Sequence, residues 1–494
     1  MTGVSNWTPI GLVVNNSARN PLKATYDGGG HKITNWTLDC DKQSSDSRYL
    51  GLFGSVSVPK NLTLDETCSF KLRSWSGTLA YQADKIENCV SYATVTAQTT
   101  SYDNANASIG GLVNIARNMI DCTNYGSITV KGGGNVGGLA VSCYNAAGCY
   151  NYGTVSATGT TVGGIAAEFS AFGNTEDEQH GVMSGCGNYG AVTGDSSVGG
   201  LAGTNEGIIE DCYNVGTVTA TDSERSSRKD VTYAGGLVGT MRTSSSYTDK
   251  LGVFNSYNAG IVAHGEVKDE LSVGQLVGYV SGNNMASCFG SLYYQQSSTL
   301  PAVGNYDVGN AAKAMTLAEM KLNSFVRTLN EYQNISLRGA TWAADADGKN
   351  NGLPVISATE KLKNYENKIL TLTLNDQSAI AGANHTFSCL TLPYGTDLTQ
   401  VEMLATISAR ATMTPASGTK LDFSKGPVTI TVTAENGSVQ EYVVTTTAAS
   451  SASGLAALRL SIGSASDPAD LTSGNYSERF LLDVKDFKPE QDTW

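Results

Sequence analysis

The stretch IIEDCYNVGTV at residues 208–218 contains a short word, Cys-x-Asn-x-Gly, that returns several times along the chain. Similar words are IDCTNYGSITV at 120–130, GCYNYGTV at 148–155 and SGCGNYGAV at 184–192. One word that recurs within a chain indicates a repeat architecture, in which each unit is a single supersecondary element. The length of the unit and the elements within it then decide the fold.

A second recurring word, Gly-Gly-Leu or Gly-Gly-Ile, interleaves with the first and sets the length of the unit. Its copies are GGLV at 110–113, GGLA at 137–140, GGIA at 163–166, GGLAG at 199–203 and GGLVG at 235–239. Successive copies begin 27 residues apart (Gly110 to Gly137) and 26 residues apart (Gly137 to Gly163). Longer units gain residues in polar stretches at 170–181, 221–230 and 240–250, which we interpret as surface loops.

Each unit splits into short β-type runs separated by glycine-containing turns, such as GGLAG, GIIEDCYN and GTVTAT within 199–221. Three short strands in about 26 residues are typical of one coil of a parallel β-helix. No amphipathic helix lies between the runs to make βαβ units, and a propeller blade needs about 40 residues. We therefore predict an all-β fold in which residues 1–299 form a parallel β-helix of eight or nine coils. The usual chirality of parallel crossovers predicts a right-handed coil.

Equivalent residues of stacked coils lie one strand spacing, about 4.8 Å, apart, so the repeated words predict columns of identical side chains. The predicted inward thiol column is Cys89, Cys122, Cys149, Cys186, Cys212 and Cys288, with Ser256 holding one place. The predicted amide column is Asn124, Asn151, Asn188, Asn214 and Asn258. The glycines that follow it, which we expect to adopt a turn conformation, are Gly126, Gly153, Gly190, Gly216 and Gly260. The tyrosines of the same word are Tyr125, Tyr152, Tyr189, Tyr213 and Tyr257.

We interpret the repeated cysteines as core residues, because a small thiol packs well in a narrow interior. A metal or redox site needs Cys and His groups that converge at one point, and no Cys-x-x-Cys occurs. Disulfides among some of the ten cysteines remain an open alternative. The tyrosines have two interpretations, a ladder that stabilises the coils, which we favour, and a surface that stacks on sugars.

The remaining chain predicts three further segments. Residues 312–333 form one helical stretch with Leu317, Met320, Phe325 and Leu329 on one face, and we expect 300–358 to cap the open end of the β-helix. Alternating runs at 368–374, 385–392, 426–434 and 440–447, with a turn at 435–437, predict an antiparallel β-sandwich over 367–447. Residues 455–494, after a linker at 448–454, read as two strands of an incomplete cadherin-like β-sandwich.

Gly-Leu-apolar-Gly followed by Cys-Tyr-Asn-x-Gly-x-Val resembles the GLUG repeat of bacterial surface proteins. The openings NWTPIG (6–11) and ATYDGGGHKITNWTLD (24–39) and the ending WAADADGKNNGLPVI (342–356) extend this resemblance over roughly 5–358. The stretch 411–445 resembles the immunoglobulin-like modules that follow such repeats. The resemblance implies a secreted or surface-displayed β-helix, found in adhesin-like proteins and in noncatalytic regions of exported enzymes, and it carries over no catalytic residue.

Charge and hydropathy exclude some partners. Only 16% of residues are charged and the formal net charge is −13, so no basic surface for nucleic acid is expected. No apolar run reaches the roughly 18 residues of a membrane span. The opening MTGVSNWTPIG lacks the pattern of a signal peptide, and the chain stops within its last module. We therefore expect a piece of a longer multidomain protein, monomeric within it.

The candidate chemical sites are weak. The acidic stretch at 174–181 offers Glu176, Asp177, Glu178 and His180, but charges clustered in one insertion are typical of a solvated loop. DADGKNNG at 345–352 is similar to a calcium loop through Asp345, Asp347 and Asn350, yet it lacks the glutamate of that motif and matches the repeat's ending. The other histidines, His31, His264 and His385, are scattered. We predict no catalytic, metal or cofactor residue.

These observations favour a noncatalytic, adhesin-like binding or scaffold protein at a bacterial surface, with a host protein or glycan as its partner. Two alternatives stay open. One is a noncatalytic ligand-binding or spacer region of a larger exported enzyme. The other is a carbohydrate-active β-helix enzyme, which requires a groove with a carboxylate pair.

Overall fold

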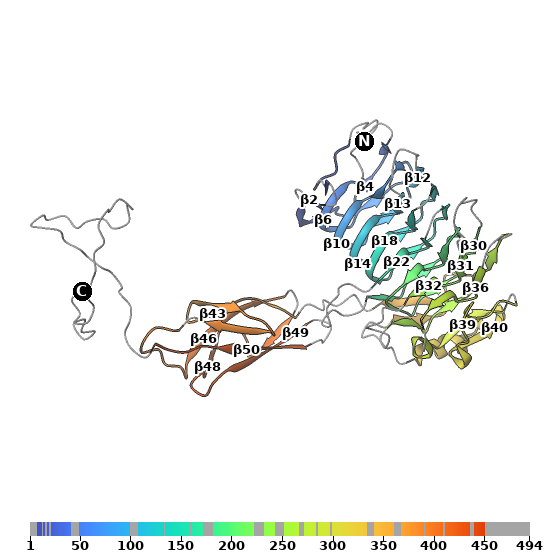
Figure 1. Cartoon of the computed structure of the whole chain (residues 1–494). Coiled ribbons are helices and arrows are strands. Elements are labelled where there is room, and N and C mark those ends of the chain that lie inside the picture. The colour runs from blue at the N-terminus through green and yellow to red at the C-terminus, as the bar shows by residue number, and fades with distance from the viewer. Residues whose placement is uncertain are drawn as a thin grey trace, which may run out of the picture. The chain divides into compact units, whose positions relative to one another are not determined.

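The structure is a computed structural model in which strands are the dominant element (Figure 1). It describes residues 7–11, 13–14, 17–18, 21–40, 49–98, 107–132, 134–158, 161–170, 181–221, 232–242, 251–265, 271–282, 285–296, 299–332, 340–359, 367–389, 391–408, 411–434 and 439–449. They belong to two compact units, Met1–Leu362 and Lys363–Trp494, which we describe separately. Over these ranges, none of the helices has the length and apolar character needed to span a bilayer.

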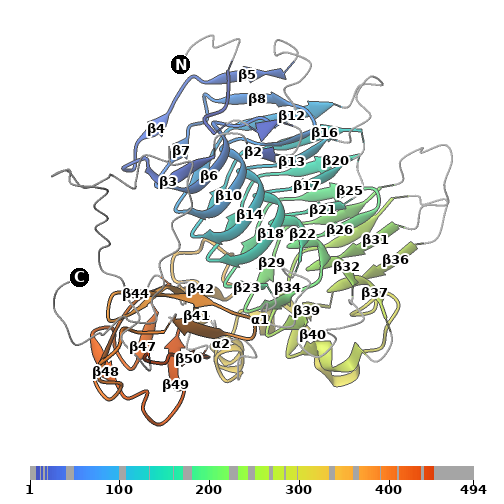
Figure 2. The ribbon, with the colours of Figure 1, turned by 60° about the vertical axis from the view of Figure 1, so that its left-hand side comes forward.

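Four parallel sheets form the walls of a β-helix in the first unit (Figures 1 and 2). The main row of the largest sheet contains β3 (Leu22–Asp27), β6 (Phe53–Lys60), β10 (Ala80–Glu87), β14 (Val113–Ile120), β18 (Ala140–Ala147), β22 (Ala166–Phe169), β27 (Ala202–Asn205), β32 (Val238–Arg242) and β37 (Val277–Ser281). A second row, which continues the long strands in later coils, contains β23 (Val182–Ser184), β28 (Ile208–Glu210), β33 (Gly252–Phe254) and β38 (Phe289–Gly290).

The other three sheets consist of shorter strands. One contains β4 (Lys32–Ile33), β7 (Thr63–Leu64), β11 (Val90–Ser91), β15 (Thr123–Asn124), β19 (Tyr150–Asn151), β24 (Gly187–Asn188), β29 (Tyr213–Asn214), β34 (Tyr257–Asn258), β39 (Leu292–Gln295) and β40 (Ala312–Met315). The next contains β5 (Thr37–Asp39), β8 (Ser69–Leu72), β12 (Thr94–Gln98), β16 (Ile128–Lys131), β20 (Val155–Ala157), β25 (Val192–Gly194), β30 (Val218–Ala220) and β35 (Val262–His264). The last contains β9 (Trp75–Gly77), β13 (Ser108–Gly110), β17 (Asn135–Gly137), β21 (Thr161–Gly163), β26 (Ser197–Gly199), β31 (Thr232–Gly235) and β36 (Leu271–Gly274), and a separate hairpin joins β1 (Val13–Val14) to β2 (Ser17–Ala18).

The predicted parallel β-helix is confirmed, but a coil contains four strands where we expected three. In the word Gly-Gly-Leu-Ala, Gly137 ends β17 and Ala140 begins β18, so this word is a corner and not a strand. A Cβ atom on Gly138 would lie only 1.9 Å from the carbonyl oxygen of Gly164 in the next coil, which excludes any larger residue. The nine strands in the main row of the largest sheet agree with the expected number of coils. The right hand stays a prediction.

The predicted thiol column lies in the main core. Thr123 pairs with Tyr150, which places Cys122 beside Cys149, and both thiols are fully buried. The same register aligns Cys89, Cys186, Cys212 and Ser256 with this pair. Ser256 holds its place by accepting the backbone N–H of Cys212 at 3.0 Å. All ten cysteines are free thiols, and burial raises the pKa of Cys122, Cys149 and Cys186 well above the ordinary value.

Cys288 was wrongly assigned to this column. Tyr257 pairs with Tyr293, so Leu292 follows Ser256 in register. Cys288 ends the 3-10 turn Met285–Cys288, where it is buried in the same core but off the column. The prediction fails here because this unit does not contain the Asn-x-Gly that fixes the register elsewhere.

The asparagine column forms a continuous chain of amide hydrogen bonds. Asn151 Nδ2 donates to Asn188 Oδ1 at 2.8 Å and to the carbonyl oxygen of Gly153 at 2.9 Å. The same two bonds recur at Asn124, Asn188 and Asn214, with amide–amide distances of 2.7–2.9 Å. These side chains are buried, so the bonds satisfy groups that would otherwise be costly to remove from water.

The repeat glycines are required for a reason other than the predicted one. A Cβ atom on Gly153 would lie 2.0 Å from the carbonyl oxygen of Gly126, because neighbouring coils approach closely at this corner. The left-handed backbone lies instead at the residue before each column cysteine. Asp121 (φ 51°) and Asp211 (φ 53°) adopt it, and Gly148 (φ 61°) and Gly185 (φ 63°) do so in the two coils between them. Asp, Asn and Gly tolerate this conformation best.

The repeat tyrosines form two columns and not one. We call Tyr92, Tyr125, Tyr152 and Tyr189 the tyrosine stack, because their rings lie parallel, with centroids 4.3–4.7 Å apart. Tyr213 and Tyr257 occupy another position of the word, and the C-terminal cap buries them. Ring faces within the stack are covered by neighbouring rings, which supports the ladder interpretation over sugar stacking.

The cap differs from the prediction in its shape and place. The expected single helix is divided into strand β40 and two short helices, α1 (Leu317–Met320) and α2 (Asn323–Asn330), and Leu317 is exposed. The helices pack with β41 (Ala340–Ala343) and β42 (Val355–Thr359) against the tyrosines of β29, β34 and β39, on the side of the β-helix (Figure 2). Ala302, Tyr306 and Val308 instead pack against the main core after its last coil.

The second unit is a β-sandwich whose two sheets share β44. One sheet contains β44 (Gln377–Ala381), β43 (Ile369–Leu374), β46 (Val401–Ile407) and β48 (Thr419–Leu421), and the other contains β44, β45 (Thr386–Cys389), β50 (Val439–Thr445), β49 (Val428–Thr433) and β47 (Thr412–Thr414). Four of these strands match the predicted runs, whereas β44, β46, β47 and β48 lie where we predicted none. The sandwich is not wholly antiparallel, because β45 and β50 pair in parallel.

Several predicted features lie outside the described residues. They are the acidic loop with Glu176, Asp177, Glu178 and His180, most of the polar insertions at 221–230 and 240–250, the turn at 435–437, and the incomplete module at 455–494.

We predict that the thiol column is inert in the folded protein. A thiol reagent should modify none of its cysteines under native conditions and all ten in denaturant without reductant. Cys212→Ala should cost about 1 kcal/mol in chemical denaturation, since only one small buried group is lost. Fewer than ten free thiols in denaturant would show that disulfides or a bound metal hold some of them.

The amide column should contribute more per residue. Asn188→Ala leaves Asn151 and Asn214 each without one partner inside the core, and we expect it to lower the free energy of unfolding by about 2 kcal/mol. Thr154→Ala, at an exposed position of a neighbouring coil, is the control and should change it by less than about 0.5 kcal/mol. Equal effects of the two substitutions in urea titrations would contradict this role.

Candidate binding pocket in the C-terminal cap

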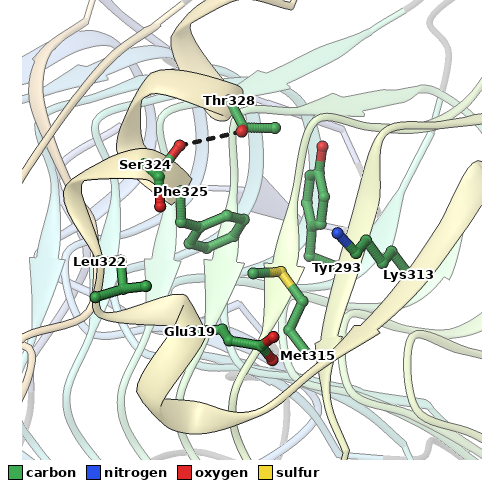
Figure 3. Close-up of a pocket in the computed structure, with 8 residues that line it drawn as sticks. All are labelled: Tyr293, Lys313, Met315, Glu319, Leu322, Ser324, Phe325 and Thr328. Carbon is green, nitrogen blue, oxygen red and sulfur yellow. Dashed lines mark hydrogen bonds between the residues drawn. The ribbon is translucent and has the colours of Figure 1, made fainter.

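A pocket of about 240 Å³ opens where the cap meets the last strands of the β-helix (Figure 3). Its wall comes from β39, from β40, and from the two short helices and the link between them. The lining residues are Tyr293, Lys313, Met315, Glu319, Leu322, Ser324, Phe325 and Thr328. Two adjacent strands and two short helices therefore meet around one concave site.

Strand pairing positions one side of the pocket. β40 adds to β39 in parallel, with Tyr293 opposite Lys313. Because side chains alternate along a strand, Lys313 and Met315 point to the same face as Tyr293. These three side chains lie together on the right of Figure 3.

Helix capping positions the other side. The Thr316 hydroxyl caps α1, and the Glu319 carboxylate returns to accept the Thr316 backbone N–H at 2.7 Å, which is a complete capping box. On α2, Ser324 and Thr328 are four residues apart and so face the same way. The Thr328 hydroxyl donates to the carbonyl oxygen of Ser324 at 3.1 Å.

An aromatic wall closes the base of the pocket. The rings of Tyr293 and Phe325 meet edge to face, with centroids 5.0 Å apart. Phe325 also contacts the ring of Tyr257 at 5.9 Å, so the wall belongs to the core of the cap. A fixed wall of this kind offers apolar surface at little entropic cost.

The charges at the pocket are one ammonium and one carboxylate. Hydrogen bonds from the Thr316 backbone and hydroxyl lower the pKa of Glu319, and Lys313 lowers it further. The carboxylate is therefore ionised at neutral pH, which suits a hydrogen-bond acceptor and not a proton donor. Lys313 supplies donors, and the Ser324 and Thr328 hydroxyls supply both donors and acceptors.

This arrangement fits a small polar ligand that has one apolar face. Concave sites in proteins usually combine apolar walls with a few polar groups that orient the ligand. The volume suits a single sugar ring or a molecule of similar size. The helical pattern and the charges of residues 312–333 do not predict the pocket. Tyr293 of β39 forms part of the wall, and β39 becomes a neighbour of this stretch only when β40 pairs with it.

The stretch that is similar to a calcium loop, which we did not predict to bind metal, is tied into the cap mainly through Asp345 and Asn350. Asp345 accepts the backbone N–H groups of Lys349, Asn350 and Gly352 at 2.7–2.9 Å. Asn350 donates to the Tyr257 hydroxyl at 2.9 Å, which ties the loop to the β-helix. Asp347 forms only an exposed ion pair with Lys349 at 3.1 Å. In the part of the chain that the structure describes, no three His, Cys, Asp or Glu side chains are grouped to hold a metal ion.

None of the three described histidines lines the pocket. His31 precedes β4, His264 ends β35, and His385 precedes β45 in the second unit.

Two sequence families match parts of the chain. The family described as the GLUG motif matches residues 194–219, which is one coil from β25 to β30. The family described as SGBP, N-terminal, matches residues 369–446, which is nearly the whole β-sandwich. These matches confirm the resemblance to GLUG-containing bacterial surface proteins.

Two solved structures show partial similarity. A protein of Bacteroides thetaiotaomicron, described as a candidate glycoside hydrolase, is 29% identical over 19% of this chain and 28% of its own, with a TM-score of 0.16. A protein of Bacteroides ovatus, described as a candidate immunoglobulin A1 protease, is 14% identical over 66% of this chain and 86% of its own, with a TM-score of 0.34. Neither superposition is close enough to transfer an activity. No curated protein matches the chain.

We predict that Asp345 stabilises the cap and that Asp347 does not. Asp345→Ala removes the acceptor of three backbone N–H groups and should lower the free energy of unfolding of the cap by about 2 kcal/mol. In a urea titration, the tryptophan fluorescence to which Trp342 contributes should therefore change at a lower urea concentration. Asp347→Ala, the matched control, should cost less than about 0.5 kcal/mol, because exposed ion pairs contribute little. A higher melting temperature on adding calcium, lost in Asp345→Ala, would support the calcium loop instead.

Proposed function

We propose that this chain is a noncatalytic glycan-binding part of a bacterial cell-surface or secreted protein, and that the cap pocket holds one sugar residue. The observation that carries the proposal is the convergence of an aromatic wall, a lysine, an ionised carboxylate and two hydroxyls around one small cavity. The match of the β-sandwich to the SGBP N-terminal family, which is named for surface glycan-binding proteins, supports the same ligand class.

The chemistry of a sugar suits these groups. Its hydroxyls donate and accept in alternation, so Lys313 and Glu319 can each engage a hydroxyl pair while Ser324 and Thr328 bind others. Its C–H face packs against aromatic rings, for which Tyr293 and Phe325 are placed. Such sites bind single sugars weakly, and a surface-displayed protein gains strength from multiple contacts along a polysaccharide.

In this proposal the β-helix and the β-sandwich present the pocket to its ligand. The β-helix is a rod of repeated coils that carries the cap on its side, and we propose that the sandwich is an immunoglobulin-like spacer module. The pocket lining contains one carboxylate, Glu319, whereas glycoside hydrolysis uses two that flank the scissile bond. This favours binding over cleavage as the role of the pocket.

A glycan array followed by calorimetry with the full chain tests the proposal. Lys313→Met and Thr328→Val, each of which removes hydrogen bonds at the pocket, should weaken binding of the selected glycan about tenfold. Lys420→Met, with the same change of charge at an exposed site in the second unit, should leave affinity unchanged. Unaltered affinity in both pocket variants would place the glycan site elsewhere, and no bound glycan at all would refute the function.

A further inference from the structure

The tyrosine stack has a geometry that the proposed function does not use. Its rings are nearly parallel, with interplanar angles of 4° between Tyr92 and Tyr125, 9° between Tyr125 and Tyr152, and 10° between Tyr152 and Tyr189. Backbone hydrogen bonds hold successive coils in register, such as Tyr152 N–H to the Asn124 carbonyl oxygen at 2.7 Å. Four phenol rings therefore lie face to face in one column.

The stack is also open to solvent at its first two rings, whereas Tyr152 and Tyr189 are half-buried. Tyr92 is 39% exposed and Tyr125 is 43% exposed, so small oxidants reach the ring edges. The buried pair Tyr213 and Tyr257 provides an internal comparison. Its rings are parallel to within 10° but 5.4 Å apart, and the Tyr257 hydroxyl donates to the Pro354 carbonyl oxygen.

We propose that the tyrosine stack is a site of oxidative dityrosine cross-linking between neighbouring coils. Adjacent rings lie at van der Waals separation, so two tyrosyl radicals formed in the stack meet before either diffuses to another chain. The modification would add a covalent link between side chains of neighbouring coils, which are otherwise connected through the backbone and held in register by hydrogen bonds. The co-reactant is a peroxide, a class of oxidant to which exposed tyrosines of a surface protein are accessible.

The chemistry balances without any group from the protein besides the two phenols. Each phenol loses one electron and its hydroxyl proton to give a phenoxyl radical. The two radicals combine through a carbon–carbon bond between ring carbons ortho to oxygen. The hydrogens on those carbons then move to the oxygens and restore two phenols. The peroxide accepts the two electrons as its O–O bond breaks, so that hydrogen peroxide with the two protons gives two waters, and persulfate gives two sulfates.

The test is oxidation of the full chain with persulfate under light activation. We expect dityrosine fluorescence in the monomer fraction and a mass loss of two hydrogens per link. Arg117 separates Tyr92 from Tyr125 and Lys131 separates Tyr125 from Tyr152, so tryptic peptides identify these links. Cleavage after Glu168 separates Tyr152 from Tyr189. Thermal unfolding of the oxidised monomer should shift upward, because a cross-link restricts the unfolded chain.

Matched substitutions make the outcome decisive. Tyr125→Phe keeps the ring but removes the phenol, and it should abolish the links to Tyr92 and Tyr152 while the link between Tyr152 and Tyr189 persists. Tyr394→Phe removes a tyrosine that is 59% exposed in the second unit and should change nothing. The proposal is overturned if the links join two chains, if they map to tyrosines outside the stack, or if the unfolded protein in urea gives the same yield.

Discussion

In-register parallel pairing, at one strand spacing per coil, is the constraint on which this structure depends. It brings equivalent residues of neighbouring coils into contact, so each repeated side chain must pack against identical side chains in the coils before and after it. Thiols tolerate this because they are small, and asparagines because an amide both donates and accepts. The corner glycines follow from the same spacing, since a Cβ atom on Gly153 would collide with the neighbouring coil. Charged residues would repel their copies, which explains why the repeated words contain so few.

The fold could be predicted from the sequence because residues at the same position of successive repeats pair with each other. Cys122, Cys149, Cys186 and Cys212 align as their words align, and Ser256 holds the place where the word changes. Cys288 was misplaced, since spacing alone does not fix register once the Asn-x-Gly is gone. The fourth strand was missed because the strand that ends at a glycine corner, such as β17 (Asn135–Gly137), is too short to show a periodicity. The left-handed corners at Asp121 and Asp211 carried a detectable signal, an Asp, Asn or Gly before each column residue.

The cap and its pocket could not be predicted in the same way. The cap contains no repeat, and its apolar residues fit a single helix as well as the observed strand and two short helices. Its place on the side of the β-helix depends on contacts distant in sequence, such as the Trp342 indole N–H donating to Asp211 at 3.2 Å. The pocket is still harder to predict from the sequence, because Tyr293 and Phe325 become neighbours only after the cap has packed on the β-helix. Tertiary packing, and not local pattern, therefore determines the candidate site.

The amide column gives the rod a direction. Every Nδ2 from Asn124 to Asn214 donates toward the following coil, and Asn258 donates to the backbone oxygen of Gln275. The two ends of the column are therefore chemically different. A coil inserted before Asn124 must offer a donor, whereas one inserted after Asn258 must offer an acceptor. A unit carrying Cys-x-Asn-x-Gly meets both conditions at any interior position, so adding or removing one whole coil there would keep the polarity of the column.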